Sequence, residues 1–215
     1  AQDFGLNADK EYQFEILAIS ENNDSVRTVL NIRAYFKVDA VFTSPMGFLL
    51  QSSDKKVMLD VLASKTPGYG FIANSEEIYE HMKNGAEPFN EIDLIYTSHT
   101  HTCHFDAVLL FNTMMHNPSA IAVMNQDVKN AMNSYFTDNP DLLNRVFAPE
   151  IPINSFIDTT LAGIKIRLTN IVHESSSMFC INLMLDSIPF VHFDDYNNLT
   201  AANYKTIGFT QLPND

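Results

Sequence analysis

A nine-residue segment, Ser98 to Asp106, contains three of the seven histidines in the chain, one of its two cysteines and an aspartate. Neutral imidazoles and a thiolate suit a borderline-soft ion such as zinc. Residues 92–96 read as a short buried strand, and residues 107–116 carry apolar side chains at helical spacing. We therefore expect the cluster on a strand-to-helix loop, where rigid scaffolds often place chemistry. Solvated loop histidines are the alternative that the spacing leaves open.

The elements on both sides of this loop must position it. The first half of the chain predicts strands at residues 12–19, 29–38, 40–43, 48–52 and 57–61. Alternating elements follow, with helices expected at 75–83, 107–116 and 126–135 and strands at 92–97 and 120–123. Ser75 is the expected N-cap of the first helix.

The last third of the sequence returns to strands. Residues 138–152 contain three prolines and are expected to form a surface connection. Strands are expected at 164–172, 178–185 and 190–193, with a turn at Asp186-Ser187 and a short helix at 199–207. The order of elements predicts an α+β protein in which sheets pack face to face with helices outside.

The composition limits the class of protein. Of the 215 residues, 46% are hydrophobic and 18% are charged, which suits one compact domain over residues 1–215. The net charge of −13, with no cluster of Lys and Arg, predicts repulsion from a phosphate backbone. We therefore expect a small-molecule substrate rather than nucleic acid. We expect no membrane span, because no apolar run approaches the ~20 residues that one needs.

The first residues and the cysteines bear on the compartment. The chain starts Ala-Gln-Asp-Phe without an initiator Met, which fits export to the periplasm or extracellular space after signal cleavage, and fits a trimmed chain as well. A cytoplasmic protein also stays open. Cys103 lies inside the histidine cluster and Cys180 inside an apolar run. We expect a metal-ligating or free thiol at Cys103 and a core thiol at Cys180.

Four stretches of the sequence together form a family pattern. Residues 92–106 read I-D-L-I-Y-T-S-H-T-H-T-C-H-F-D, residues 47–60 form an expected hairpin, His173 follows an expected strand, and residues 191–195 read V-H-F-D-D. In order and spacing they resemble the metallo-β-lactamase superfamily, with its H-x-H-x-D-H motif and its strand ending in Gly-Asp. The resemblance covers roughly residues 40–210. It implies a four-layer αβ/βα sandwich of the metallo-β-lactamase type, incomplete at its C-terminus if the chain ends at residue 215.

The resemblance also implies a set of metal ligands. His99, His101 and His173 would bind a first ion, and His104 and Asp195 would serve a second, together with Cys103 in the altered motif. The implied cofactor is zinc, as one or two ions. Three imidazoles leave a fourth tetrahedral position for water, and zinc lowers the pKa of that water to about 7. The implied activity is attack of metal-bound hydroxide on an ester, amide or phosphoester.

Two departures from the family pattern concern the second ion. Cys103 stands where the motif has an aspartate that orients the attacking water, and a thiol is a poorer proton acceptor and liable to oxidation. No histidine follows His192, although the family usually supplies a later ligand. Either the chain continues beyond residue 215, or the second ion has only Cys103, His104 and Asp195. Cys103 and Asp195 are the residues that we expect to decide catalysis.

Several residues near the cluster are expected to support the metal site or the fold. Asp60 ends an expected strand, and the resemblance implies that it supports the geometry of the metal loop. Asp106 either orients a ligand imidazole or complements the dipole of the helix that it precedes. For His192 we expect a supporting or structural role. His81 is expected on the surface, and His116 is expected to interact with a helix C-terminus.

Two functional hypotheses from different classes follow. The leading hypothesis is a zinc-dependent hydrolase. The alternative is a catalytically silent relative that acts as a binding or scaffold protein, motivated by Cys103 and the missing late histidine. Redox or thiol chemistry at Cys103 is a third, weaker possibility. Neither the substrate nor the oligomeric state follows from the sequence.

Overall fold

The computed structural model describes residues 11–19, 25–33, 38–44, 46–68, 70–174 and 176–193. The chain divides into two compact units, residues 1–37 and residues 38–215. In the first unit, β1 (Glu11–Ile19) pairs with β2 (Ser25–Arg33) in an antiparallel hairpin. The strand expected at 29–38 therefore starts earlier, at Ser25, and residues 34–37 of the expected range lie outside the described residues. The expected single domain over residues 1–215 stays a prediction.

The larger unit contains a six-stranded mixed sheet. Its order is β3 (Asp39–Ser44), β4 (Gly47–Gln51), β5 (Lys56–Leu59), β6 (Leu94–Thr97), β7 (Ile121–Met124) and β8 (Val146–Phe147). The first three strands form the expected antiparallel meander, and β5 to β8 are parallel. All side chains of β5 and β6 are buried, as expected of strands covered on both faces. The β5 and β6 strands end beside each other, and the histidine loop follows β6.

A second sheet is antiparallel throughout. Its order is β12 (Ile188–His192), β11 (Ser176–Leu185), β10 (Ile164–His173) and β9 (Ser155–Leu161). Asp186 and Ser187 both have positive φ, so they form the expected tight turn between β11 and β12. The β9 strand was not predicted. It lies at the edge of the sheet, and its side chains alternate between half-buried and exposed.

The helices begin and end close to where their capping residues predict. Ser75 caps α1 (Glu76–Asn84) by accepting from the Ile78 amide, and Gly85 ends it in the left-handed conformation. The α2 helix (Ala107–His116) matches its predicted range. The helix predicted at 126–135 is wrong as one element, since Met132 separates α3 (Gln126–Ala131) from α4 (Asn133–Asp138). The connection expected at 138–152 contains a 3₁₀ helix, Pro140–Arg145, and β8.

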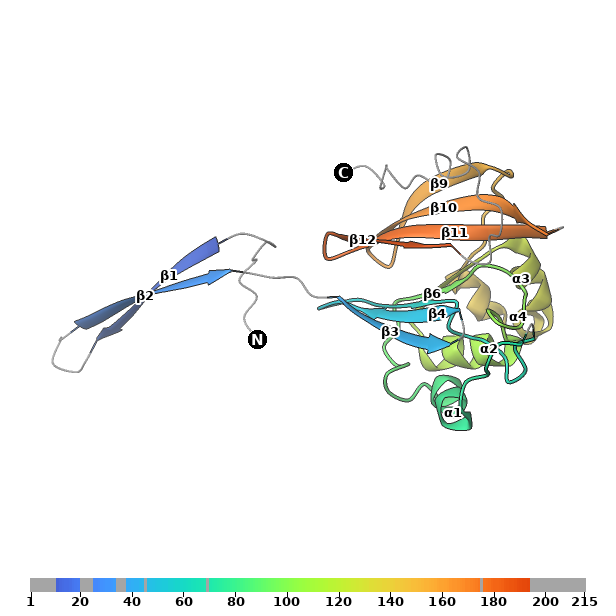
Figure 1. Ribbon diagram of the computed structural model, residues 1–215, viewed down its shortest axis with the longest axis horizontal. Helices are drawn as coiled ribbons and strands as arrows, with labels where there is room; N and C mark the ends of the chain where they lie inside the picture. The colour runs from blue at the N-terminus through green and yellow to red at the C-terminus, as the bar shows by residue number, and fades with distance from the viewer. Residues whose placement is uncertain are drawn as a thin grey trace. The chain divides into compact units, whose positions relative to one another are not determined.

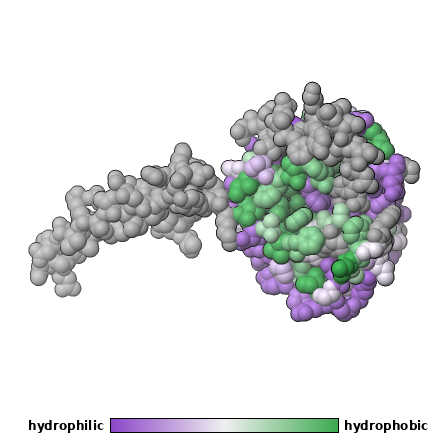
Figure 2. All heavy atoms as spheres, in the orientation of Figure 1, coloured by the Kyte–Doolittle hydropathy of each residue, from purple (hydrophilic) through white to green (hydrophobic). Residues whose placement is uncertain are grey.

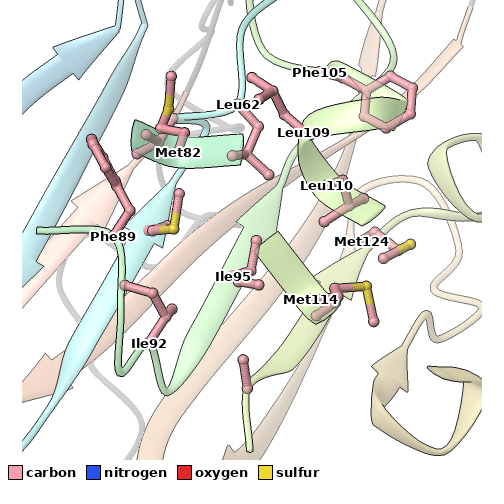
Figure 3. Close-up of a cluster of buried hydrophobic side chains, with 14 of the residues drawn as sticks. Leu62, Met82, Phe89, Ile92, Ile95, Phe105, Leu109, Leu110, Met114 and Met124 are labelled. Atoms are coloured by element: carbon pink, nitrogen blue, oxygen red, sulfur yellow. The ribbon is translucent and has the colours of Figure 1, made fainter. Parts of the chain in front are cut away.

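Two hydrophobic cores define the layers. One core joins the facing surfaces of the two sheets and includes Leu59, Tyr96, Ile166 and Ile181. The other joins the opposite face of the mixed sheet to α1, α2 and α3, with buried side chains such as those in Figure 3. Figure 1 shows the β9–β12 sheet above the mixed sheet and α1 and α2 below it.

These layers confirm the predicted α+β sandwich of two face-to-face sheets. The helix expected at 199–207 lies outside the described residues. Among the helices that are described, none combines the length and apolar character needed to cross a membrane.

Candidate metal centre

Three imidazoles meet where the two sheets face each other. His99 and His101 lie on the loop after β6, and His173 is the last residue of β10. One ring nitrogen of each lies within 4.8 Å of the others. The ring centroid of His99 lies 4.4 Å from that of His101 and 5.0 Å from that of His173, and the His101 and His173 centroids are 5.1 Å apart.

The donor set fits a zinc ion. With Zn–N bonds of about 2.1 Å, tetrahedral geometry places ligand nitrogens about 3.4 Å apart, so the three ring nitrogens, which lie within 4.8 Å of one another, would move closer together on binding one ion. Nε2 of His173 is buried and makes no hydrogen bond to any residue that the structure describes. A buried ring nitrogen normally has a hydrogen-bond partner or binds a metal ion. The structure therefore brings together the three predicted ligands of the first ion, and their binding of metal stays a prediction.

The backbone holds the histidine loop in a tight turn. The amides of His104 and Phe105 both donate to the carbonyl of His101, at 2.9 Å. The Ser64 amide donates to the Thr102 carbonyl at 2.8 Å, and the Phe179 amide of β11 donates to the Ser98 carbonyl at 3.2 Å. The loop is thus fixed both to the segment after β5 and to the second sheet.

The electrostatics keep the His99 imidazole neutral. Burial lowers the pKa of His99 to about 3, and the neighbouring histidines add to this effect, His104 most strongly, against the opposing charge of Asp60. The hydroxyl of Ser98 lies 2.9 Å from Nδ1 of His99. Ser98 was not predicted as a site residue, although its position directly before His99 was a signal. A neutral imidazole oriented through one nitrogen is suited to bind metal through the other.

Asp60 is a buried carboxylate that contacts the histidine loop. It follows β5 with φ of 49°, and its side chain is fully buried. Oδ1 accepts from the Ser98 amide at 2.8 Å, and Oδ2 lies 2.8 Å from Nε2 of His192 and 3.7 Å from Nδ1 of His104. Burial alone would raise the pKa of Asp60, but the hydrogen bonds from His104 and His192 hold that pKa well below its ordinary value. Asp60 is therefore an anion at neutral pH.

Two of the predicted ligands of a second ion, Cys103 and His104, are among the described residues. Cys103 and His104 are fully buried, and neither belongs to the three-histidine group found among the described residues. The His104 ring lies 4.5 Å from the His99 ring and turns Nδ1 toward Asp60. Asp195 lies outside the described residues. A second ion, and the catalytic roles assigned to Cys103 and Asp195, stay predictions.

The other predicted residues have local partners. Asp106 is the N-cap of α2, where Oδ1 accepts from the Leu109 amide at 3.0 Å, so it complements the start of that helix. Nδ1 of His116 lies 2.9 Å from the Asn112 carbonyl, which confirms its expected interaction at the C-terminus of α2. Nδ1 of His81 lies 3.1 Å from the Glu87 carbonyl.

Both cysteines are free and buried. Cys180 packs with Ile171 and Met178, which confirms the expected core thiol. The Cys103 thiol is equally enclosed, at 0% exposure.

Apolar side chains gather on one face of the larger unit, as Figure 2 shows. Phe42 and Ile72 are exposed, and together with residues 70–75 they line an open pocket of about 600 Å³. Gly68 lies two residues before this segment, and a Cβ there would lie 3.2 Å from Oγ1 of Thr102. Gly68 thus lies against the histidine loop.

Comparisons with known proteins found structural similarities at low sequence identity. The sequence matches no protein-family profile and no curated protein. Among solved structures, a protein from Parabacteroides distasonis described as a candidate metal-dependent hydrolase is 10% identical, with a TM-score of 0.46 over 84% of this chain and 65% of that one. A metallo hydrolase from the archaeon Ignicoccus hospitalis is 14% identical, with a TM-score of 0.44 over 71% of this chain and 57% of that one. The short form of human tRNase Z is 12% identical, with a TM-score of 0.47 over 80% of this chain and 72% of that one.

This chain thus spans less than two thirds of the length of the first two of these proteins. By its own strand order and cores, the larger unit has the α+β architecture, a mixed sheet packed against an antiparallel sheet, that the resemblance to the metallo-β-lactamase superfamily predicts.

Proposed function

We propose that this protein is a zinc-dependent hydrolase that acts on an ester, amide or phosphoester bond of a small molecule. The observation that carries the proposal is the convergence of His99, His101 and His173, whose ring nitrogens lie within 4.8 Å of one another. His173 ends a strand of the second sheet, whereas His99 and His101 lie on the loop after β6 of the mixed sheet, so residues far apart in the sequence form the group.

The residues of the chain would divide the work between binding and orientation. His99, His101 and His173 would hold one zinc ion and leave one side of it open to water or substrate. When bound, zinc supplies Lewis acidity and lowers the pKa of its water to about 7. Ser98 orients His99 through Nδ1, and Glu174, with Oε2 located 3.7 Å from Nε2 of His101, places a carboxylate beside the second ligand.

Metal stoichiometry tests the proposal directly. The purified protein is stripped with a chelator, reconstituted with zinc, freed of excess ion and analysed for bound metal. We expect about one zinc per chain in the parent, given the tight binding of such ligand sets. His173→Ala should lose most of that zinc, whereas His116→Ala, which removes a histidine at the end of α2, should keep it. Less than about 0.2 zinc per parent chain would refute the proposal.

The alternative function is a catalytically silent binding or scaffold protein. The observation that favours it is Cys103, which replaces an aspartate of the family motif and is buried outside the three-histidine group. If the alternative holds, Cys103→Asp should gain hydrolysis of generic esters or phosphodiesters that the parent lacks. Cys103→Ser is the matched control, because it changes the thiol without adding a carboxylate. Parental hydrolysis that His101→Ala abolishes would reject the alternative.

A further inference from the structure

The two sheets are joined by a buried hydrogen bond between residues 132 positions apart. Nε2 of His192, the last residue of β12, lies 2.8 Å from Oδ2 of Asp60, which follows β5. The side chains are 9% and 0% exposed. Nε2 of His192 is the donor of this hydrogen bond, and the carboxylate oxygen is its acceptor.

The same carboxylate contacts both ends of the histidine loop. Oδ1 of Asp60 accepts from the Ser98 amide at 2.8 Å, directly before His99. Oδ2 lies 3.7 Å from Nδ1 of His104, near the end of the loop. The position of Asp60 therefore fixes the backbone at Ser98, where the loop begins, and the orientation of the His104 ring.

The His192 ring is itself held in one orientation. The Tyr96 ring lies 6.0 Å away at an interplanar angle of 89°, and the Phe48 ring lies 6.4 Å away at 78°. The backbone of His192 is fixed by pairing with Ile181 of β11. An imidazole in T-shaped contact with two aromatic rings has little freedom to leave Asp60, so its N–H is a rigid donor.

We propose that His192 is a positioning residue, which fixes Asp60 and through it the histidine loop across the gap between the two sheets. The hydrogen bond at Oδ2 keeps the carboxylate from rotating, so Oδ1 stays on the Ser98 amide and His99 keeps its place. The effect on the loop does not depend on a metal ion. Its effect on zinc affinity rests on the proposed function.

The test compares three variants with the parent. His192→Phe keeps a flat ring and removes the donor, and His192→Gln keeps an N–H donor at a similar reach. Phe190→Leu is the matched control, because it loosens packing on the same strand without touching Asp60. Amide hydrogen exchange is measured at Ser98 to His104 in the metal-free proteins, zinc affinity by competition with a chromophoric chelator, and global stability by urea unfolding.

We expect His192→Phe to speed exchange in the loop about tenfold and to weaken zinc binding about 10- to 100-fold, the usual effect of removing a residue that orients a metal site. His192→Gln should restore both to within about threefold of the parent. Equal loop exchange in the parent and His192→Phe would overturn the inference. So would failure of His192→Gln to restore the parental values, or an equal acceleration in Phe190→Leu. Faster loop exchange in His192→Phe, together with no zinc bound by the parent, would support the inference and refute the proposed function.

Discussion

Acidification of the metal-free protein should lower its free energy of unfolding, because His99 is buried in its neutral form. The pKa of His99 is lowered from 6.5 to about 3 in the folded protein. The unfolded chain therefore binds the proton more tightly, and the free energy of unfolding falls as the pH drops from about 6.5 toward about 3. From these two values, His99 alone removes about 1.4 kcal/mol at pH 5.5 and about 2 kcal/mol at pH 5.0, relative to pH 8.

Urea unfolding in the presence of a chelator, at pH 8.0 and pH 5.5, measures this loss. In His99→Gln the same drop in pH should cost about 1.4 kcal/mol less than in the parent, because glutamine does not titrate. His116→Gln, which removes an exposed histidine at the end of α2, should follow the parent. If His99→Gln and the parent lose equal free energy between the two pH values, His99 is not held neutral by burial and the reasoning fails.

Three further predictions concern Asp60, the N-cap of α2 and the glycine that ends α1. Asp60→Ala removes a buried anion and leaves its hydrogen-bond donors without an acceptor. It should therefore lower the free energy of unfolding at pH 7 by about 3–5 kcal/mol in a urea titration. A loss under about 1 kcal/mol would contradict this expectation. Asp106→Ala should lower the free energy of unfolding by about 1 kcal/mol, because α2 loses its N-cap. Asp106→Asn, which can still cap the helix, should lower it by about half as much or less. Equal losses in the two variants would show that the cap is unimportant. Gly85→Ala should lower the melting temperature far more than Gly163→Ala. A Cβ on Gly85 would lie 2.5 Å from Cβ of His116, whereas a Cβ on Gly163 would meet only the Lys55 side chain, at 3.7 Å or more. Similar shifts in the two glycine variants would show that positive φ alone sets the cost.

Elements with strong local signals were predictable from the sequence. The α1 helix has both an N-cap serine and a terminal glycine, and α2 matches its predicted range. The β9 strand escaped prediction because its segment, Ser155–Leu161, lacks an apolar run. This agrees with its place in the structure, where no side chain of the strand is fully buried. The break at Met132 was also missed, because the sequence there contains neither Gly nor Pro to mark it.

The candidate site was predictable where its residues are close in sequence. His99, His101 and His104 stand out as a cluster, but His173 was included only through the family resemblance. The contact between Asp60 and His192 has no signature in the sequence, since each residue alone fits an ordinary buried strand end. The pairing becomes visible only when the two sheets are placed face to face, which periodicity does not determine.

His173 lies more than 70 residues after His99 and His101, and this separation has a consequence for when the metal would be acquired during biosynthesis. A nascent chain that has emerged only through β9 already presents His99 and His101 but lacks His173, the last residue of β10. With two of three ligands, an early chain would hold zinc weakly and exchange it readily. Stable loading would have to wait until β10 has left the ribosome and docked, so retention of zinc would report that β10 has joined the fold.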